Sequence, residues 1–235
     1  MTEVAIDETL EAARQRLARA LDAAGRPPHA AELLAVSKTK PAGLIRAAHA
    51  CSQRAFGENY LQEALDKQQA LTDLDDIVWH FIGPLQSNKT RQVAEHFAWV
   101  HSIEREKIAR RLSEQRPAEL APLNVCLQVN ISAEASKAGV SLDALPTLAA
   151  AVLALPRLRL RGLMAIPAPS DDPQRQREPF ARLRHALEAL QARHPEAPLD
   201  TLSMGMSDDL EAAVAEGATL VRLGTAIFGQ RPPRD

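Results

Sequence analysis

The stretch Leu33-Leu-Ala-Val-Ser-Lys-Thr-Lys-Pro41 indicates how this chain folds. Its apolar half, residues 33–36, predicts a strand buried on both faces, as the strands of parallel sheets are. The polar half, which ends at Pro41, predicts that the strand breaks into a loop, so Lys38 stands at the carboxyl end of the strand. Burial and a second cation nearby, such as Lys40, lower the pKa of an amine, and a neutral amine forms Schiff bases. The alternative is that Lys38 extends its ammonium group into solvent.

Outward from this stretch, short apolar runs alternate with longer helical patterns. Eight strands are predicted, at residues 32–36, 54–57, 77–82, 98–102, 124–131, 158–165, 200–204 and 219–224. Helices are predicted at residues 42–50, 59–71, 87–96, 105–114, 142–153, 173–192 and 208–215, and an additional N-terminal helix at residues 9–24. Such alternation is typical of α/β proteins with a parallel sheet. At this length we expect a single (β/α)8 TIM barrel in one domain, residues 1–235, with an open doubly wound sheet as the alternative.

Composition and charge disfavour several classes of protein. The 235 residues carry a formal net charge of -2 and are 3% aromatic, which argues against a nucleic-acid-binding surface. No Gly-x-Gly-x-x-Gly motif follows the first predicted strand, which disfavours a dinucleotide-binding sheet. The N-terminal region lacks the apolar core of a signal peptide, and no apolar run approaches the length of a membrane span. Cys51 and Cys126 have no metal-binding spacing, so we expect reduced thiols, no metal, a cytoplasmic location and neither nucleic-acid nor membrane partners.

In a barrel of this type the functional site lies at the carboxyl ends of the strands, so the residues there are candidates. After the seventh predicted strand, the segment Ser203-Met-Gly-Met-Ser207 leads into a helix. We expect Ser207 to be the N-cap of this helix, and Gly205 to let the backbone turn tightly or approach a ligand. A helix N-terminus offers N–H groups to an anion, although a capped helix without a ligand is the alternative.

The eighth predicted strand ends in Arg222, Gly224 and Thr225, which offer a guanidinium group, backbone N–H groups and a hydroxyl group. Barrels commonly bind phosphate in the loops after strands seven and eight, although Arg222 in a solvated salt bridge is the alternative. Closure of the barrel makes these loops neighbours of Lys38. A lysine beside a phosphate site suits a phosphorylated aldehyde, and pyridoxal 5'-phosphate is the obvious candidate.

At this point the residues resemble a known family, the pyridoxal phosphate homeostasis proteins, which have an alanine-racemase-type barrel. The matching motifs are spread over nearly the whole chain. They are AVSKTKP (35–41), FGENYLQEALDK (56–67), WHFIGPLQSNK (79–89), VHSIEREKIA (100–109), VNISAEASKAG (129–139), LRGLMAI (160–166), LSMGMSDDLEAAVAEGAT (202–219) and VRLGTAIFG (221–229).

The resemblance implies which residues handle the cofactor. It implies that Lys38 forms the Schiff base with pyridoxal phosphate and that Lys137, in the SKAG match, is a second lysine involved in cofactor handling. It also implies cofactor-binding residues around Lys38, which are Asn59, His80, Ser203, Met204, Gly205, Met206, Ser207, Arg222, Gly224 and Thr225. We further expect Arg222 to face the pyridine nitrogen and keep it unprotonated, which weakens the ring as an electron sink.

The resemblance implies a role in cofactor homeostasis rather than an established reaction. We expect a reversible carrier of pyridoxal phosphate that affects amino-acid and keto-acid balance, donates to apo-enzymes and is a monomer. The fold expected is the fold-type III barrel without the C-terminal β-domain, which leaves an open site that permits cofactor exchange.

Two enzymatic alternatives remain open from the sequence. A low-activity racemase needs a base on each face of the substrate α-carbon. Lys38 serves one face, but the only tyrosine is Tyr60, and we expect His80 and His101 to be hydrogen-bonded walls of the site. The other alternative is a cofactor-free aldolase that forms a Schiff base with a phosphorylated sugar.

Overall fold

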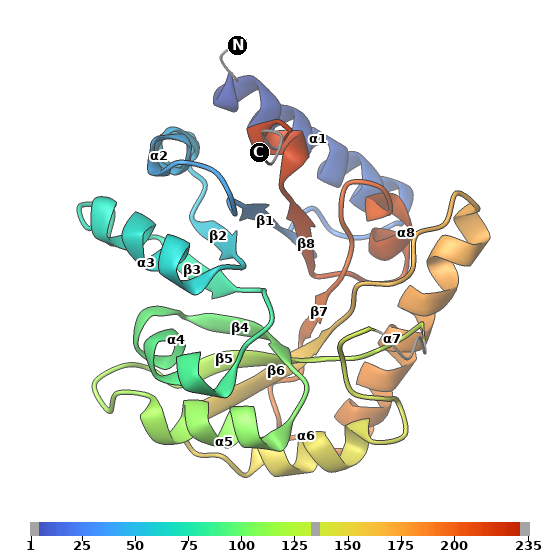
Figure 1. Cartoon of the computed structure of the whole chain (residues 1–235). Coiled ribbons are helices and arrows are strands. Elements are labelled where there is room, and N and C mark those ends of the chain that lie inside the picture. The colour runs from blue at the N-terminus through green and yellow to red at the C-terminus, as the bar shows by residue number, and fades with distance from the viewer. Residues whose placement is uncertain (1–4, 133–136, 231–235) are drawn as a thin grey trace.

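The computed structural model describes residues 5–132 and 137–230. Its eight strands form one closed barrel in which neighbouring strands are parallel and follow the order of the chain (Figure 1). The strands are β1 (Glu32–Val36), β2 (Ala55–Glu58), β3 (Val78–Phe81), β4 (Trp99–Ile103), β5 (Leu123–Gln128), β6 (Leu158–Met164), β7 (Thr201–Ser203) and β8 (Leu220–Leu223). The predicted (β/α)8 barrel is confirmed and the open sheet is wrong, because β8 pairs with β1.

Helices surround the barrel on its outside (Figure 1). They are α1 (Ile6–Ala23), α2 (Ala42–Ala50), α3 (Leu61–Ala70), the 3-10 turn η1 (Ser87–Lys89), α4 (Thr90–His96), α5 (Glu106–Gln115), α6 (Leu145–Leu153), α7 (Pro173–Arg193), α8 (Leu210–Ala215) and α9 (Thr225–Phe228). Each predicted helix is present. The turn α9 was not predicted, since a single turn is too short to show a helical period.

The additional N-terminal helix is confirmed as α1, and it packs against α8 and α9 (Figure 1). Its buried face is built from apolar residues three or four positions apart, such as Leu10, Leu17 and Leu21. No helix among residues 5–132 and 137–230 is long and apolar enough to cross a membrane.

The interior of the barrel differs from its outer layer. Between the strands and the helices lies an apolar core that includes Phe56, Phe81 and Phe180. Branched apolar side chains usually fill the inside of such barrels as well. Here, by contrast, His101, Ser203 and Arg222 are buried at 4% exposure or less. Polar groups buried to this extent need partners, so their hydrogen bonds decide what the interior does.

Candidate functional site

Lys38 leaves the barrel at the carboxyl end of β1, a strand that lies between β2 and β8. The N–H of Lys40 donates to the carbonyl of Ser37 (3.1 Å) and closes a turn around Lys38 and Thr39. Thr39 has a φ of 65°, in the left-handed region that a β-branched residue seldom adopts. Ser37 is fully buried whereas Lys38 is half-buried, so the Lys38 side chain extends from a turn whose preceding residue is held in the core.

A buried ion-pair network holds this turn from the side of β2 and α3. The ammonium group of Lys67 donates to the carbonyl of Ser37 (2.7 Å), to Oε1 of Glu58 (2.7 Å) and to Oε1 of Glu63 (2.5 Å). The hydroxyl of Ser37 donates to Glu58 (2.8 Å), and the N–H of Thr39 donates to Glu63 (2.5 Å). We call Ser37, Glu58, Glu63 and Lys67 the Lys67 network. Burial raises the pKa of Glu58, and the Lys67 ammonium group acts against that rise.

Lys40 joins the Lys38 turn to the segment that follows α9. Its ammonium group donates to the carbonyl oxygens of Gly229 (2.9 Å) and Gln230 (2.7 Å), which follow α9. The loop after β1 and the segment after β8 are therefore tied together, as the closed barrel requires.

The loop after β7 turns sharply at Gly205. This residue has a φ of 98°, and a Cβ atom there would lie 2.7 Å from the Cβ of Ala213. Only glycine fits both the conformation and the space. Ser203 and Met204 just before it are fully buried, whereas Met206 after it is exposed. The turn thus carries the chain from the barrel interior to the surface within a few residues.

The N-cap prediction for Ser207 is wrong, because α8 begins at Leu210 and its N-cap is Asp209. The carboxylate of Asp209 accepts the N–H of Met206 (2.7 Å), so a separate turn precedes the helix. Burial raises the pKa of Asp209, while this hydrogen bond and the charge of Arg222 oppose the rise. The N–H of Met206 is therefore bonded within the protein and does not face a ligand as a free donor.

The end of β8 lies directly against the end of β1. A Cβ atom at Gly224 would lie 3.3 Å from the carbonyl oxygen of Val36, two residues before Lys38. The single turn α9 starts here, and the N–H groups of Gly224 and Thr225 donate to no acceptor among the described residues. Thr225 is exposed. The geometry therefore places open backbone donors beside the Lys38 turn.

Inside the barrel, a chain of hydrogen bonds runs from Arg222 to His80. Arg222 donates to the hydroxyl of Ser203 (2.8 Å) and to the carbonyl of Ala165 (3.1 Å). Ser203 Oγ lies 2.7 Å from His101 Nδ1, and His101 Nε2 lies 2.9 Å from His80 Nδ1. We call His80, His101, Ser203 and Arg222 the interior chain. Both histidines are hydrogen-bonded, as expected.

Burial governs the charges of the interior chain. It lowers the pKa of His80 to about 3 and that of His101 well below its ordinary value, with the charge of Arg222 adding to the effect on His101. Burial also lowers the pKa of Arg222, to about 10. At neutral pH the chain therefore consists of two neutral imidazoles, one hydroxyl group and one cation.

Of the remaining predicted residues, Asn59 and Lys137 lie after two other strands, whereas His80 lies within β3. Asn59 follows β2, and its Oδ1 is buried without a hydrogen-bond partner among the described residues. Backbone packs tightly here, since a Cβ at Gly83 would lie 2.3 Å from the carbonyl oxygen of Asn59. Lys137 follows β5 and is half-buried, and its carbonyl accepts a hydrogen bond from Asn130 Nδ2 (3.4 Å). His80 lies deeper than the others and reaches Arg222 only through His101 and Ser203.

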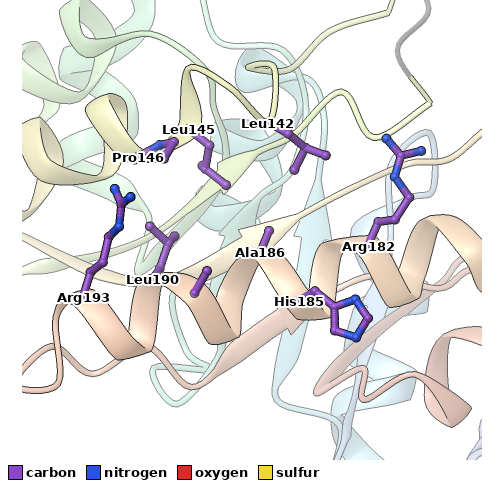
Figure 2. A pocket seen from close by; sticks show the side chains of 9 residues that line it. Leu142, Leu145, Pro146, Arg182, His185, Ala186, Leu190 and Arg193 are labelled. Atoms are coloured by element: carbon purple, nitrogen blue, oxygen red, sulfur yellow. The ribbon is translucent and has the colours of Figure 1, made fainter.

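An apolar groove of about 370 Å³ lies elsewhere, between α6 and α7 (Figure 2). It is lined by Leu145, Ala186 and Leu190, with Arg182 and Arg193 at its ends. The groove is on the outer helical layer and contains none of the predicted site residues. It is therefore separate from the site at the strand ends.

The Lys67 network was not predicted from the sequence. Its signal in the sequence was a glutamate directly after a buried strand, followed by Glu63 and Lys67 at the helical spacing of four residues. A surface ion pair has the same spacing, so the pattern alone does not reveal burial.

Known proteins match this chain over nearly its whole length. The alanine racemase N-terminal domain family matches residues 9–232. The pyridoxal phosphate homeostasis protein of Pseudomonas aeruginosa is 62% identical over 96% of both chains. That of Escherichia coli is 56% identical over 96% of this chain and 97% of the relative. The solved structure of PipY from Synechococcus elongatus with PLP bound is 40% identical, has a TM-score of 0.85 and covers 95% of this chain and 100% of PipY. The chain therefore belongs to the pyridoxal phosphate homeostasis protein family.

Proposed function

We propose that this chain binds pyridoxal 5'-phosphate through a Schiff base at Lys38 and serves as a reversible carrier in homeostasis of the cofactor. The observation that carries the proposal is the contact of Gly224 with Val36, which brings open N–H groups beside the Lys38 turn. The names of the P. aeruginosa and E. coli relatives, and the PLP bound to PipY, support it.

The residues present fit this cofactor. When bound, pyridoxal phosphate supplies an aldehyde that reacts with an amine and a ring that accepts negative charge. Lys38 supplies the amine, and the segment from Ser203 to Ser207 together with Gly224 and Thr225 holds the phosphate. Asn59 contributes a buried oxygen that has no partner among the described residues, as expected for an atom that binds a ligand. Lys137 acts as a second lysine in the exchange of cofactor.

Arg222 sets the electronic character of the site. A guanidinium group has only N–H donors, so beside a pyridine nitrogen it binds the unprotonated form. Such a ring is a weaker electron sink than a protonated one. We propose that Arg222 faces the pyridine nitrogen and that this arrangement favours storage of the cofactor over amino-acid chemistry.

A carrier suits the described residues better than a racemase does. Racemisation requires a second base opposite Lys38. The imidazoles of His80 and His101 are buried in the interior chain, and the only tyrosine, Tyr60, is 43% exposed at the start of α3. None of these three side chains is therefore positioned like Lys38 at a strand end. The low-activity racemase remains the alternative function.

The cellular role follows from reversible binding. We propose a single-domain, cytoplasmic monomer that hands pyridoxal phosphate to apo-enzymes and thereby affects amino-acid and keto-acid balance. Cys51 and Cys126 are free thiols, which suits a reducing compartment. Light scattering of the purified protein tests the oligomeric state.

An absorbance spectrum of the purified protein, before and after borohydride reduction, tests the central claim. We expect a visible band that borohydride abolishes and that the Lys38→Ala variant lacks. Lys107→Ala, which removes an exposed lysine of α5, is the matched control and keeps the band. If no band forms after pyridoxal phosphate is added, Lys38 is not its attachment site and the sugar-phosphate aldolase becomes the better hypothesis.

A second measurement separates carrier from enzyme. The protein loaded with pyridoxal phosphate is incubated with L-alanine or L-serine, and formation of the D-isomer is followed with Lys38→Ala as the background. A carrier shows no turnover above that background. Turnover at roughly 1 per second, an ordinary enzyme rate, contradicts the carrier role.

A further inference from the structure

The hydrogen bonds of the interior chain run in one direction. Arg222 has only donors, so Ser203 Oγ accepts from it. The hydroxyl hydrogen of Ser203 has no other acceptor among the described residues and points to His101 Nδ1. A neutral His101 then carries its hydrogen on Nε2 and donates to His80 Nδ1.

The last member of the chain is therefore a donor. Because His80 Nδ1 accepts from His101, a neutral His80 carries its hydrogen on Nε2. This N–H donates to no acceptor among the described residues, although His80 is only 3% exposed. A buried donor of this kind needs a partner.

A pocket at the amino-terminal ends of the strands lies next to that donor. It has a volume of about 530 Å³, which is the size of a small-molecule site. Its lining includes Glu32, Arg54, His80, Trp99, Arg161 and Asp200. Four of these residues, Glu32, Arg54, Trp99 and Asp200, lie at or just before the starts of β1, β2, β4 and β7, so the pocket lies on the face opposite the Lys38 turn.

Further donors surround the pocket. Arg161 uses three of its N–H groups on Asp200 and Asn124, and its guanidinium group lies 4.9 Å from the centre of the Trp99 ring. A guanidinium group has five N–H donors in total, so donors remain for a ligand. His80 stacks on the same Trp99 ring at 5.3 Å. Trp99 thus contacts both His80 and Arg161 and holds their side chains in place.

The charges around the pocket select the type of ligand. Arg161 is paired with Asp200 (2.7 Å), and Arg54 is paired with Asp76 (2.5 Å). The exposed carboxylate of Glu32 adds a negative charge at the rim. A strongly charged anion is disfavoured here, whereas a monoanion with a hydrogen-bond acceptor matches the donors.

We propose that this amino-terminal pocket is a second binding site, which takes a small carboxylate whose oxygen accepts the Nε2–H of His80. The interior chain connects this site to Arg222, because each hydrogen bond polarises the next. Occupancy of the pocket thereby acts on Arg222 from the opposite face of the barrel. This site goes beyond the proposed cofactor carrier and does not depend on it.

Nitrogen-15 NMR of the imidazole groups in protein free of pyridoxal phosphate tests the proposal. Sodium acetate is the probe, and sodium chloride at the same ionic strength is the control. We expect both histidines as Nε2–H tautomers and a saturable, acetate-specific shift at His80, followed by a smaller one at His101. Chloride leaves both unchanged, and His80→Phe, which keeps the stack on Trp99, abolishes the saturable response.

A rim variant keeps the test decisive if His80→Phe does not fold. Glu32→Gln removes the exposed negative charge, and we expect roughly threefold tighter acetate binding from it. An equal response to chloride, an Nδ1–H tautomer of either histidine, or acetate binding unchanged by Glu32→Gln overturns the proposal. Tighter binding of inorganic phosphate than of acetate contradicts the carboxylate. Because no pyridoxal phosphate is present, none of these results bears on Lys38.

Discussion

Two clusters of buried polar side chains, the Lys67 network and the interior chain, each hold a buried cation, and they do so in opposite ways. The Lys67 network pairs a buried ammonium group with two carboxylates, Glu58 at 2.7 Å and Glu63 at 2.5 Å. The interior chain holds one guanidinium group through neutral partners. One group relies on matched charges, and the other relies on fully directed hydrogen bonds.

The difference shows what each group controls. The Lys67 network binds the backbone of Ser37 and Thr39, so it fixes where the Lys38 turn lies. The interior chain ends on the side chain of Arg222, so it fixes how a cation is oriented under the strand ends. A buried charge that loses its partner is costly, whereas a neutral hydrogen bond costs less to break. Variants that remove one partner at a time test this difference.

Lys67→Met has the largest expected effect. It leaves Glu58, which is fully buried, without its cation. We expect the free energy of unfolding to fall by roughly 3–5 kcal/mol, as when one partner of a buried ion pair is removed. Urea denaturation monitored by circular dichroism measures the change.

Two further variants show whether this loss comes from the ion pair. Lys89→Met, at an exposed lysine, changes the free energy of unfolding by less than about 0.5 kcal/mol. Adding Glu58→Gln to Lys67→Met recovers part of the loss, because the buried charge is gone. A loss below about 1 kcal/mol in Lys67→Met contradicts the assigned role of the network.

The interior chain, unlike the Lys67 network, contains histidines, and they make the free energy of unfolding depend on pH below 6.5. The folded-state pKa of His80 is lowered from 6.5 to about 3, so below pH 6.5 the unfolded chain binds a proton that the folded chain does not. The free energy of unfolding therefore falls as the pH drops from 6.5 toward 3. For His80 alone we expect a loss of about 2 kcal/mol between pH 6.5 and about pH 5.

Urea denaturation at several pH values in this window measures the slope. In His80→Phe the contribution of this histidine disappears, so the decline between pH 6.5 and 5 becomes shallower by about 1 kcal/mol per pH unit on average. His185→Phe, at a histidine of α7 that is not part of the interior chain, keeps the wild-type slope. Equal slopes in wild type and His80→Phe would show that His80 is not held neutral.

Serine substitutions compare the two groups directly, because Ser203 and Ser37 are both fully buried. Ser203→Ala leaves Arg222 and His101 without their shared partner, and we expect a loss of roughly 1–3 kcal/mol. Ser37→Ala removes one donor from Glu58, which keeps the Lys67 ammonium group, so we expect only about 1 kcal/mol. Denaturation of both variants measures the difference. A larger loss in Ser37→Ala reverses the comparison.

The fold was predictable from the sequence because the strands are short apolar runs and the helices between them have a helical period. Residues 32–36 and 42–50 match β1 and α2 at both ends for this reason. The N-cap of α8 was not predictable in this way, because both Ser207 and Asp209 are residue types that cap helices. Only the hydrogen bond from the N–H of Met206 to the carboxylate of Asp209 shows which turn forms.

The candidate site was predictable in part. The positions of Lys38, Gly205 and Gly224 at strand ends follow from the order of the elements once the barrel closes. The interior chain joins residues 102 positions apart in the sequence, His101 and Ser203, whose contact depends on side chains meeting across the barrel. No local pattern records such a contact, and the same holds for the amino-terminal pocket.

Thr39→Gly has the smallest expected effect, and its sign differs from that of the other variants. Thr39 has a φ of 65°, and its buried hydroxyl has no partner among the described residues. Glycine relieves both costs but adds freedom to the unfolded chain, so we expect a net stabilisation of about 1 kcal/mol. Ser52→Gly, at an exposed position that also has a positive φ, is the control for relief of strain alone. If strain at Thr39 serves to hold Lys38 in place, Thr39→Gly also weakens binding of pyridoxal phosphate, measured by titration of the visible band, whereas Ser52→Gly does not. Stabilisation with unchanged cofactor binding would show that the Lys67 network alone positions the Lys38 turn.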